Sequence, residues 1–249
     1  MFKQRSDQLE IMDDLSFSDG VVFQTLKELK VINHWLGGNQ VTIEGFRRLL
    51  KQPAFDSPNA DLTVADLGSG GGDMMVEIAK WSRNKGLSFR LTGIDANPAI
   101  IDYARENTAT FSEINHQPLD VFSEEFKDET YDIITCTLFA HHFKDDQLIE
   151  LFKNLKSQAR IGIVINDLHR HWLAYYSIKI LTRLFSRSYM VKYDAPLSVA
   201  RSFRRHDWHK IFREAGVKRY SIRWRWAFRW LVIIPGTASS TPPTAPFPL

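Results

Sequence analysis

The chain has 249 residues, enough to bury the core of one enzyme-sized α/β domain. Its single cysteine, Cys136, excludes an internal disulfide framework and a cysteine metal site. The N-terminus lacks the apolar core of a secretion signal, and no apolar run approaches the roughly 20 residues that span a bilayer, so we expect a cytoplasmic protein.

Charge is divided unevenly along the chain. Residues 151–249 hold 18 of the 32 Lys and Arg residues but 4 of the 29 Asp and Glu residues, and five of the seven tryptophans. Such asymmetry is typical of a chain that meets an anionic partner at one end. Three interpretations stay open: the basic residues pair with the acidic half, they contact a membrane surface or an acidic carrier, or they bind nucleic acid.

The first 55 residues predict a helical cap. Apolar residues recur at helical spacing over residues 7–51, with a break at Gly37-Gly38, and we expect this cap to stand apart from the sheet. Alternating strands and helices then predict an α/β domain over residues 56–234. Asn97-Pro98 predicts one helix start, with an N-cap followed by proline. Strands are expected near 62–67, 89–95, 114–118, 131–138 and 161–166, with helices near 72–84, 98–109 and 145–158.

The first predicted strand runs into the glycine turn Gly68-Ser69-Gly70-Gly71-Gly72, with Asp66 two residues before it. Glycines let a ligand approach the main chain closely, so the turn predicts a cofactor cradle. The third glycine of a dinucleotide fingerprint is replaced by Asp73, and no acid follows at the usual spacing. Asp66 would repel a diphosphate and favour a cation, which indicates a sulfonium cofactor.

These residues resemble the class I S-adenosylmethionine-dependent methyltransferases, whose first motif is acid-x-Gly-x-Gly-x-Gly. The resemblance implies that Asp95 takes the ribose hydroxyls, that Asp120 lies beside the adenine, and that strand 131–138 closes over the methionine end. It also implies a Rossmann-like α/β fold: a mostly parallel seven-stranded sheet, helices on both faces, a helical N-terminal cap and a lid after strand five, about 170–204. The implied cofactor-binding residues are Asp66, Gly68, Ser69, Gly70, Gly72, Asp95, Ala96, Asn97, Asp120, Val121, Thr137 and Leu138.

The segment after the fifth strand departs from alternation. Residues 171–188 predict a helix with basic residues at every fourth position, opposite an apolar band. Two interpretations stay open: a lid that packs its apolar band over the active site, or a helix at a membrane interface.

A helix near 205–215 and strands near 217–226 and 228–234 follow. The segment 235–249, with five prolines and no charge, predicts a disordered tail. In the predicted helix 171–188, the basic residues are Lys179, Arg183 and Arg187, and the apolar band includes Leu173, Tyr176, Ile180 and Leu184.

Histidines follow the fourth and fifth strands, where the methyl group is expected. A phenol, with a pKa of about 10, is ionised to about one part in a thousand at neutral pH, which is roughly 4 kcal/mol. A histidine is well matched to remove that proton, so we predict His142 or His169 as the base, with His141 as a further candidate. Asp167 is expected to orient a neighbouring histidine. This mechanism needs no metal, and none is predicted.

The substrate class is narrowed by a missing motif. Methyltransferases that act on the exocyclic amines of nucleic-acid bases carry an Asn/Asp-Pro-Pro-aromatic motif after strand four. This chain has Leu138-Phe139-Ala140-His141-His142 there, which disfavours such a substrate. The core is similar to ubiquinone and menaquinone biosynthesis methyltransferases. Residues 194–201 and 224–230 resemble bacterial enzymes proposed to methylate phenolic or polyketide-derived, lipid-tailed products. This resemblance implies methyl transfer to an oxygen or ring carbon of an apolar hydroxyaromatic, of quinone-precursor or polyketide type. Peripheral contact with the inner membrane face fits this expectation. The alternative is a non-catalytic cofactor-fold protein that binds nucleic acid or membrane through its basic, aromatic C-terminal region.

Overall fold

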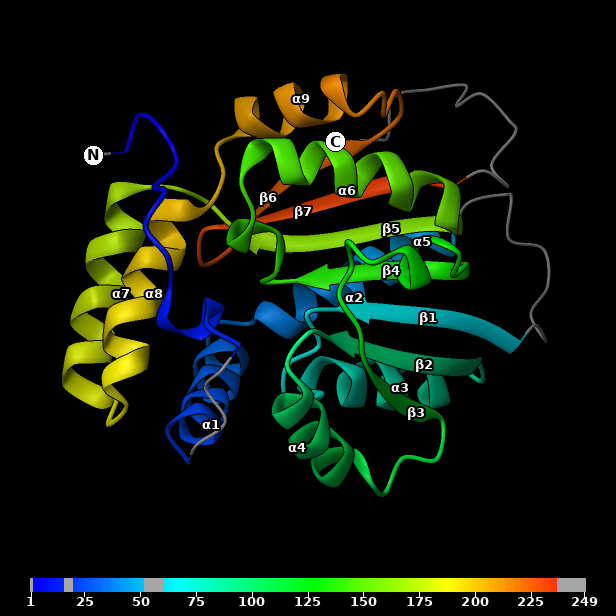
Figure 1. Cartoon of the computed structure of the whole chain (residues 1–249), viewed down its shortest axis with the longest axis horizontal. Coiled ribbons are helices and arrows are strands. Elements are labelled where there is room, and N and C mark those ends of the chain that lie inside the picture. Colours follow the sequence, from blue (N-terminus) through cyan, green and yellow to red (C-terminus); the bar gives the residue numbers. More distant parts are fainter. Residues whose placement is uncertain (1, 16–19, 52–60, 237–249) are drawn as a thin grey trace.

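The computed structural model describes residues 2–15, 20–51 and 61–236. Seven strands form one sheet in the order β3-β2-β1-β4-β5-β7-β6 (Figure 1). Neighbours from β3 to β5 run parallel, whereas β7 is antiparallel to both β5 and β6. The predicted mostly parallel seven-stranded sheet is confirmed. The strands are β1 (Asp61–Leu67), β2 (Ser88–Asp95), β3 (Ile114–Pro118), β4 (Tyr131–Thr137), β5 (Ala159–Leu168), β6 (Ser221–Arg225) and β7 (Arg229–Pro235).

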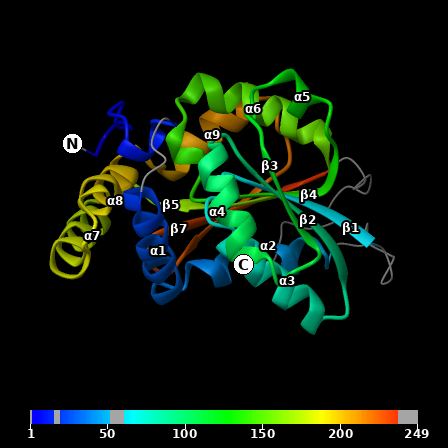
Figure 2. The ribbon, with the colours of Figure 1, turned by 60° about the horizontal axis from the view of Figure 1, so that its bottom comes forward.

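Helices cover both faces of the sheet, as predicted. Figure 2 shows α6 and α9 on one side of the sheet and α2 and α3 on the other, and each pair buries an apolar cluster against the strands. The helices are α1 (Gly20–Trp35), α2 (Gly38–Leu49), α3 (Asp73–Asn84), α4 (Pro98–Thr108), α5 (Glu124–Lys127), α6 (Asp145–Gln158), α7 (Trp172–Phe185), α8 (Tyr189–Arg201) and α9 (Arg205–Glu214), with 3-10 turns η1 (Ile11–Asp13) and η2 (Ala140–His142).

The N-terminal region differs from the separate helical cap that the sequence predicted. The first α-helix begins at Gly20, and the described residues before it are largely extended around η1. Helix α2 belongs to the sheet layer: Phe46 and Leu49 are fully buried, and α2 contacts β5 and β7. The physical reason is that α2 carries its apolar residues at positions that form one face, and the neighbouring strands leave that face a matching apolar surface.

The lid consists of two helices where the sequence predicted one. Helix α7 ends at Phe185, and α8 begins after Ser188, whose hydroxyl accepts a hydrogen bond from the Val191 amide. The two helices pack together, with Pro196 inside α8. The tail prediction falls mostly outside the described residues, since β7 ends at Pro235 and residues 237–249 are not described.

The carboxyl ends of the parallel strands meet at one edge of the sheet. Figure 1 shows α1, α7, α8 and the N-terminal segment gathered beyond that edge. Helix α4 starts there as predicted, since the Asn97 side chain accepts hydrogen bonds from the amides of Ala99 and Ile100, and Pro98 takes the first helical position. Ligands of such sheets bind at this edge.

Candidate active site

A cavity of about 1140 Å³ lies at the carboxyl ends of β1, β2 and β4. Residues of η1, α1, α7, α8 and the β6–β7 turn complete its wall, so segments far apart in the chain enclose one space. Most of the lining side chains are apolar, with a small number of carboxylates and histidines among them. This combination is typical of a small-molecule site.

The glycine turn after β1 forms part of this wall. Gly68 has a φ of +67°, and a Cβ added to it would lie 2.1 Å from the Phe139 ring. A Cβ on Gly72, with a φ of +77°, would lie 2.7 Å from the Thr108 side chain. Larger residues are therefore excluded at both positions by backbone conformation and by space.

Asp66 lies beneath the turn with almost no exposed surface. Its Oδ1 atom and the Ser69 hydroxyl are buried and have no hydrogen-bond partner among the described residues. Burial, and then the charge of Asp95, raise the pKa of Asp66 to about 8. A buried carboxyl without a partner is costly unless a ligand satisfies it. These orphaned atoms fit a cationic cofactor group held beside the turn.

Asp95 and Asp120 both line the cavity. The Asp95 carboxylate accepts hydrogen bonds from the amides of Gly70 and Asn97, each at 3.1 Å, which fixes it at the end of β2. Burial raises the pKa of Asp95. Asp120 is exposed, and one of its oxygens accepts from the Phe122 amide. Each carboxylate can accept further hydrogen bonds from a bound ligand, because each of its oxygens carries more than one lone pair.

The twelve cofactor-binding residues that the sequence predicts fall into two groups. Those that line the cavity are Gly68, Gly70, Asp95, Ala96, Asp120, Val121 and Leu138. The others stand behind the wall: Asn97 caps α4, Gly72 begins α3, and the Thr137 hydroxyl bonds to Thr42. Asp66 and Ser69 complete that second group.

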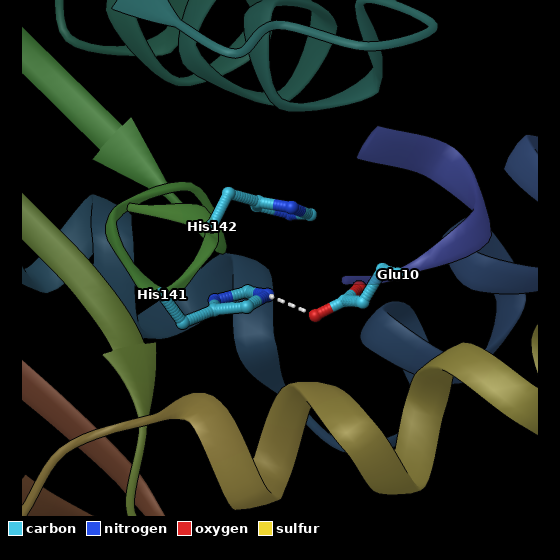
Figure 3. A group of neighbouring side chains, drawn as sticks. All are labelled: Glu10, His141 and His142. Carbon is cyan, nitrogen blue, oxygen red and sulfur yellow. Dashed lines mark ion pairs between the residues drawn. The ribbon is translucent and has the colours of Figure 1, made fainter. Parts of the chain in front are cut away.

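The η2 turn holds two neighbouring histidines, each oriented by a carboxylate. His141 Nδ1 lies 2.8 Å from Asp167, and His142 Nδ1 lies 2.6 Å from Asp13. Their ring centroids are 4.4 Å apart. Figure 3 shows both rings beside Glu10, whose Oε1 lies 3.8 Å from His141 Nε2. A carboxylate that accepts Nδ1–H leaves Nε2 as the basic nitrogen, so each ring presents its basic atom away from its carboxylate.

Glu10 and Asp13 line the cavity but were missed in the sequence. Burial raises the pKa of Glu10 to about 7. Burial also opposes ionisation of Asp13, but the hydrogen bonds and charges of His142 and Arg201 outweigh it and lower its pKa to about 2. In the sequence both residues belong to a charged, polar N-terminal stretch, where carboxylates ordinarily face solvent, so no local signal distinguishes them.

Arg201, at the end of α8, joins these groups. Its guanidinium donates to Asp13 and to the carbonyl oxygens of His141 and His142, and it lies 3.8 Å from Glu10. Side-chain ligand atoms of Glu10, His141 and His142 lie within 4.8 Å of one another, a spacing that suits a metal ion. Arg201 already brings a positive charge to these carboxylates, which disfavours a second cation. That no metal is needed stays a prediction.

His169 lies outside this group and does not line the cavity. Its ring contacts Trp230 and His171, at centroid distances of 4.9 and 5.5 Å, and burial, with nearby positive charges, lowers its pKa to about 4. Asp167 is fully buried against His141. The structure therefore brings His141, His142 and Asp167 together and places His169 elsewhere.

Comparison with known proteins identifies part of the chain directly. Residues 64–162 match the family described as a methyltransferase domain. None of the curated proteins matches. The matched segment runs from the first predicted cofactor strand into β5, and it contains the glycine turn, Asp95, Asp120 and the η2 histidines.

Solved structures extend the likeness to the whole fold. The plantazolicin methyltransferase BpumL in complex with SAH is 18% identical with a TM-score of 0.59, over 87% of this chain and 100% of that one. Human N-acetylserotonin methyltransferase in complex with SAM is 16% identical with a TM-score of 0.58, over 85% of this chain and 55% of that one.

A putative O-methyltransferase from Nostoc punctiforme is 13% identical with a TM-score of 0.55, over 80% of this chain and 56% of that one. The chain thus spans little more than half the length of several of these proteins. The matched family is a methyltransferase domain, and two of these neighbours are bound to SAM or SAH. Both findings support the predicted enzyme class, a methyltransferase, and the predicted cofactor, S-adenosylmethionine. The chain carries a methyltransferase domain with the fold of the class I S-adenosylmethionine-dependent methyltransferases.

Proposed function

We propose that this protein transfers the methyl group of S-adenosylmethionine to an oxygen or ring carbon of a small, apolar hydroxyaromatic, of quinone-precursor or polyketide type. The observation that carries the proposal is that the Asp95 end of the glycine-turn site and the carboxylate-oriented His142 line one largely apolar cavity. Cofactor and acceptor would therefore meet in a space that excludes water from the reacting atoms.

Three carboxylates would hold the cofactor. Asp95 would accept hydrogen bonds from the ribose hydroxyls, and Asp120 would lie at the adenine end, since both line the cavity. Asp66 lies behind the wall with its Oδ1 atom unpaired, and it would attract the cofactor's amino group from beneath the turn. When bound, the cofactor supplies an electrophilic methyl on a sulfonium. Asp66 would ionise beside the cationic cofactor, and its negative charge would then favour the sulfonium over the neutral-sulfur product.

His142 would prepare the acceptor. Asp13 accepts from Nδ1 and fixes the ring, so Nε2 is the atom that takes the proton of the acceptor hydroxyl. Ionisation of a phenol at neutral pH costs roughly 4 kcal/mol, and a positioned histidine removes much of this barrier. Glu10 and the His141–Asp167 pair lie beside this ring and would receive the proton in turn.

The acceptor class is supported by the lining and by the kinds of proteins that share the fold. Most of the lining side chains are aromatic or aliphatic, and α1, α7, α8 and the β6–β7 turn each contribute some of them. Structural neighbours include a polyketide synthase methyltransferase domain from citrinin synthesis and the DszA carbon methyltransferase. A non-catalytic nucleic-acid-binding protein would have no use for a buried, unsatisfied Asp66 beside a glycine cradle.

Cofactor binding provides the first experiment. We expect Asp95→Ala to abolish binding of S-adenosylmethionine in calorimetry while circular dichroism shows a folded protein. Asp102→Ala, which removes an exposed acid of α4, is the matched control and should bind normally. An unchanged affinity of Asp95→Ala would remove the assigned cofactor site.

Acceptor identity needs a second measurement. With a methyl-labelled cofactor and a panel of phenols of increasing apolar size, we expect transfer that improves with apolar size. Intact cofactor binding without transfer to any hydroxyaromatic would overturn the acceptor class and leave the cofactor site standing.

A further inference from the structure

The outer face of α7 exposes a continuous apolar stripe. Leu173, Tyr176, Ile180 and Leu184 recur at helical spacing, and their exposed fractions run from 43% for Leu173 to 69% for Leu184. Phe185 at the end of the helix is 78% exposed. Both views place α7 at the outer edge of the molecule (Figures 1 and 2). The predicted lid arrangement, with this band turned onto the active site, is therefore wrong.

The opposite face of α7 does close the cavity. Ala174, Ile178 and Leu181 line it, and α7 also packs on α8. Helix α7 is therefore apolar on both faces, which is unusual for a helix at the surface of a protein. One apolar face packs within the fold, and the exposed apolar face indicates a binding partner outside it.

Positive charge borders the stripe. Because successive helical residues are 100° apart, Lys179 and Arg183 lie beside the apolar stripe, not opposite it as the sequence was interpreted. These two side chains, with Arg187 and Lys192, are exposed and form no ion pair with a carboxylate among the described residues. No acidic residue occurs from Leu168 to Tyr193. The surface is cationic and apolar at once.

A second basic site adjoins the same helix. A groove between the N-terminal segment and helices α7 and α8 is lined by Lys3, Lys179 and Lys192, with Tyr175 and Tyr193 beside them. Three ammonium groups in one groove suit an anionic group such as a phosphodiester. The aromatic tyrosines supply apolar contact with a polar tip, as residues at a lipid headgroup layer do.

The β6–β7 turn extends this face. Phe228 stacks on His171 at the start of α7, with ring centroids 5.2 Å apart. Trp224 and Trp226 line the cavity and are also 45% and 76% exposed, so the cavity reaches the surface there. Tryptophans beside an apolar opening favour the interface between water and lipid.

We propose that the outer face of α7, with Trp224 of β6 and Trp226 of the β6–β7 turn, docks on an anionic lipid surface and brings the mouth of the cavity against the lipid. No helix within the described part of the chain is long and apolar enough to cross a membrane, so the contact is that of a helix lying in the interface. An apolar acceptor dissolved in lipid then enters the cavity without crossing water. The docking itself does not depend on the proposed methyl transfer.

Charge argues against the other occupants of this face. In a symmetric dimer through α7, Lys179 and Arg183 of both copies would be brought close together, which costs energy because α7 itself carries no acid to balance them. Nucleic acid would match the charge but would leave Ile180, Leu184 and Phe185 in water or against phosphates. An anionic bilayer satisfies both the apolar stripe and its basic border.

Vesicle flotation of the full chain tests this inference. We expect the protein to float with phosphatidylcholine vesicles that contain phosphatidylglycerol, to bind pure phosphatidylcholine far less, and to lose binding as salt is raised. Ile180→Glu with Leu184→Glu should lower the partition coefficient at least about tenfold, and Lys179→Gln with Arg183→Gln about fivefold per charge. Lys80→Gln with Lys85→Gln, on α3 and at its C-cap, is the matched control and should bind as the wild type does.

Each contrary result overturns the inference. These are absence of flotation with anionic vesicles, equal flotation with neutral ones, or loss of binding in the α3 control. A dimer in light scattering that Ile180→Glu with Leu184→Glu dissociates would assign the face to a second copy instead. Salt-sensitive oligonucleotide binding lost in Lys179→Gln with Arg183→Gln, without vesicle binding, would assign it to nucleic acid. Methyl transfer to a water-soluble phenol is measured in parallel, since it survives loss of docking.

Discussion

The Nε2 atom of His142 is the atom on which turnover depends under the proposed function. His142→Ala should lower kcat by about 10²- to 10⁴-fold at neutral pH, because the acceptor hydroxyl then loses its base. Cofactor affinity should be nearly unchanged, since the carboxylates that hold the cofactor remain. Steady-state kinetics and calorimetry on the same preparation separate the two effects.

His169→Ala is the control for that experiment. His169 lies outside the cavity, and its pKa of about 4 leaves it a weak base, so kcat should be preserved. A comparable loss of kcat in both variants, or full activity of His142→Ala, would show that the proton leaves by another route.

Asp66 links stability to pH. Its pKa is about 8 in the folded protein and near 3.8 when unfolded, so between these values the folded state holds a proton that the unfolded state has released. Stability of the cofactor-free protein therefore falls as pH rises through this window. Asp66→Asn removes that loss and should raise the free energy of unfolding by about 1–3 kcal/mol at pH 8, with no gain at pH 4.

Denaturant titrations at several pH values measure this difference. The same variant should bind S-adenosylmethionine more weakly, because the buried carboxylate that balances the cofactor's charge is gone. A stability difference that is the same at pH 4 and pH 8 would show that Asp66 titrates normally.

Among the elements, the N-terminal segment holds part of the active site and is itself held by Arg5. Its guanidinium donates to the carbonyl oxygens of Arg201 and Phe143, pairs with Asp145 and lies 4.4 Å from the Phe203 ring centre. Arg5→Ala should free residues 2–15 and lower kcat on the order of tenfold, because Asp13 no longer fixes His142.

Hydrogen exchange checks the Arg5→Ala prediction. Amides of residues 2–15 should exchange faster in this variant, while those of β4 and β5 stay protected. Arg47→Ala, which removes an exposed charge of α2, should change neither exchange nor kcat. Loss of kcat with the segment still protected would separate Arg5 from the positioning of Asp13.

The secondary-structure elements also show how much of the fold could be predicted from the sequence. The parallel strands, the glycine turn and the start of α4 were predicted, because each has a local cause: an apolar run, a φ that requires glycine, or an N-cap with proline. Helix α8 was not predicted from the sequence. Its Pro196 is typical of a helix break, and charged residues such as Asp194 and Arg201 are ordinarily exposed, although both are buried here. Their burial depends on partners in the N-terminal segment.

For the whole molecule, the acidic and basic halves of the chain meet in part. Arg225 pairs with Glu44, Arg160 with Asp132, and Lys210 with Asp145, so some of the basic excess pairs with the acidic half. The basic residues of α7 do not take part, which is why that helix carries the membrane inference.

The arrangement of the whole site also bears on metal dependence. Arg201 supplies positive charge to Glu10 and Asp13, so methyl transfer should be insensitive to chelators. We expect equal kcat after exhaustive treatment with EDTA and after addition of divalent cations. A loss on chelation that one cation restores would instead place a metal among Glu10, His141 and His142.

The sequence by itself determined the α/β class, the strand order along the chain, the cofactor turn and the place of the histidines after β4, because these follow from local periodicity, backbone conformation and a motif of short range. The tertiary structure alone decided that Asp13 holds His142, that His169 lies outside the cavity, and that α7 turns its apolar stripe outward. Each of these features depends on packing between segments that are far apart in the chain or that belong to different layers of the fold. No local sequence pattern encodes which of those segments pack together.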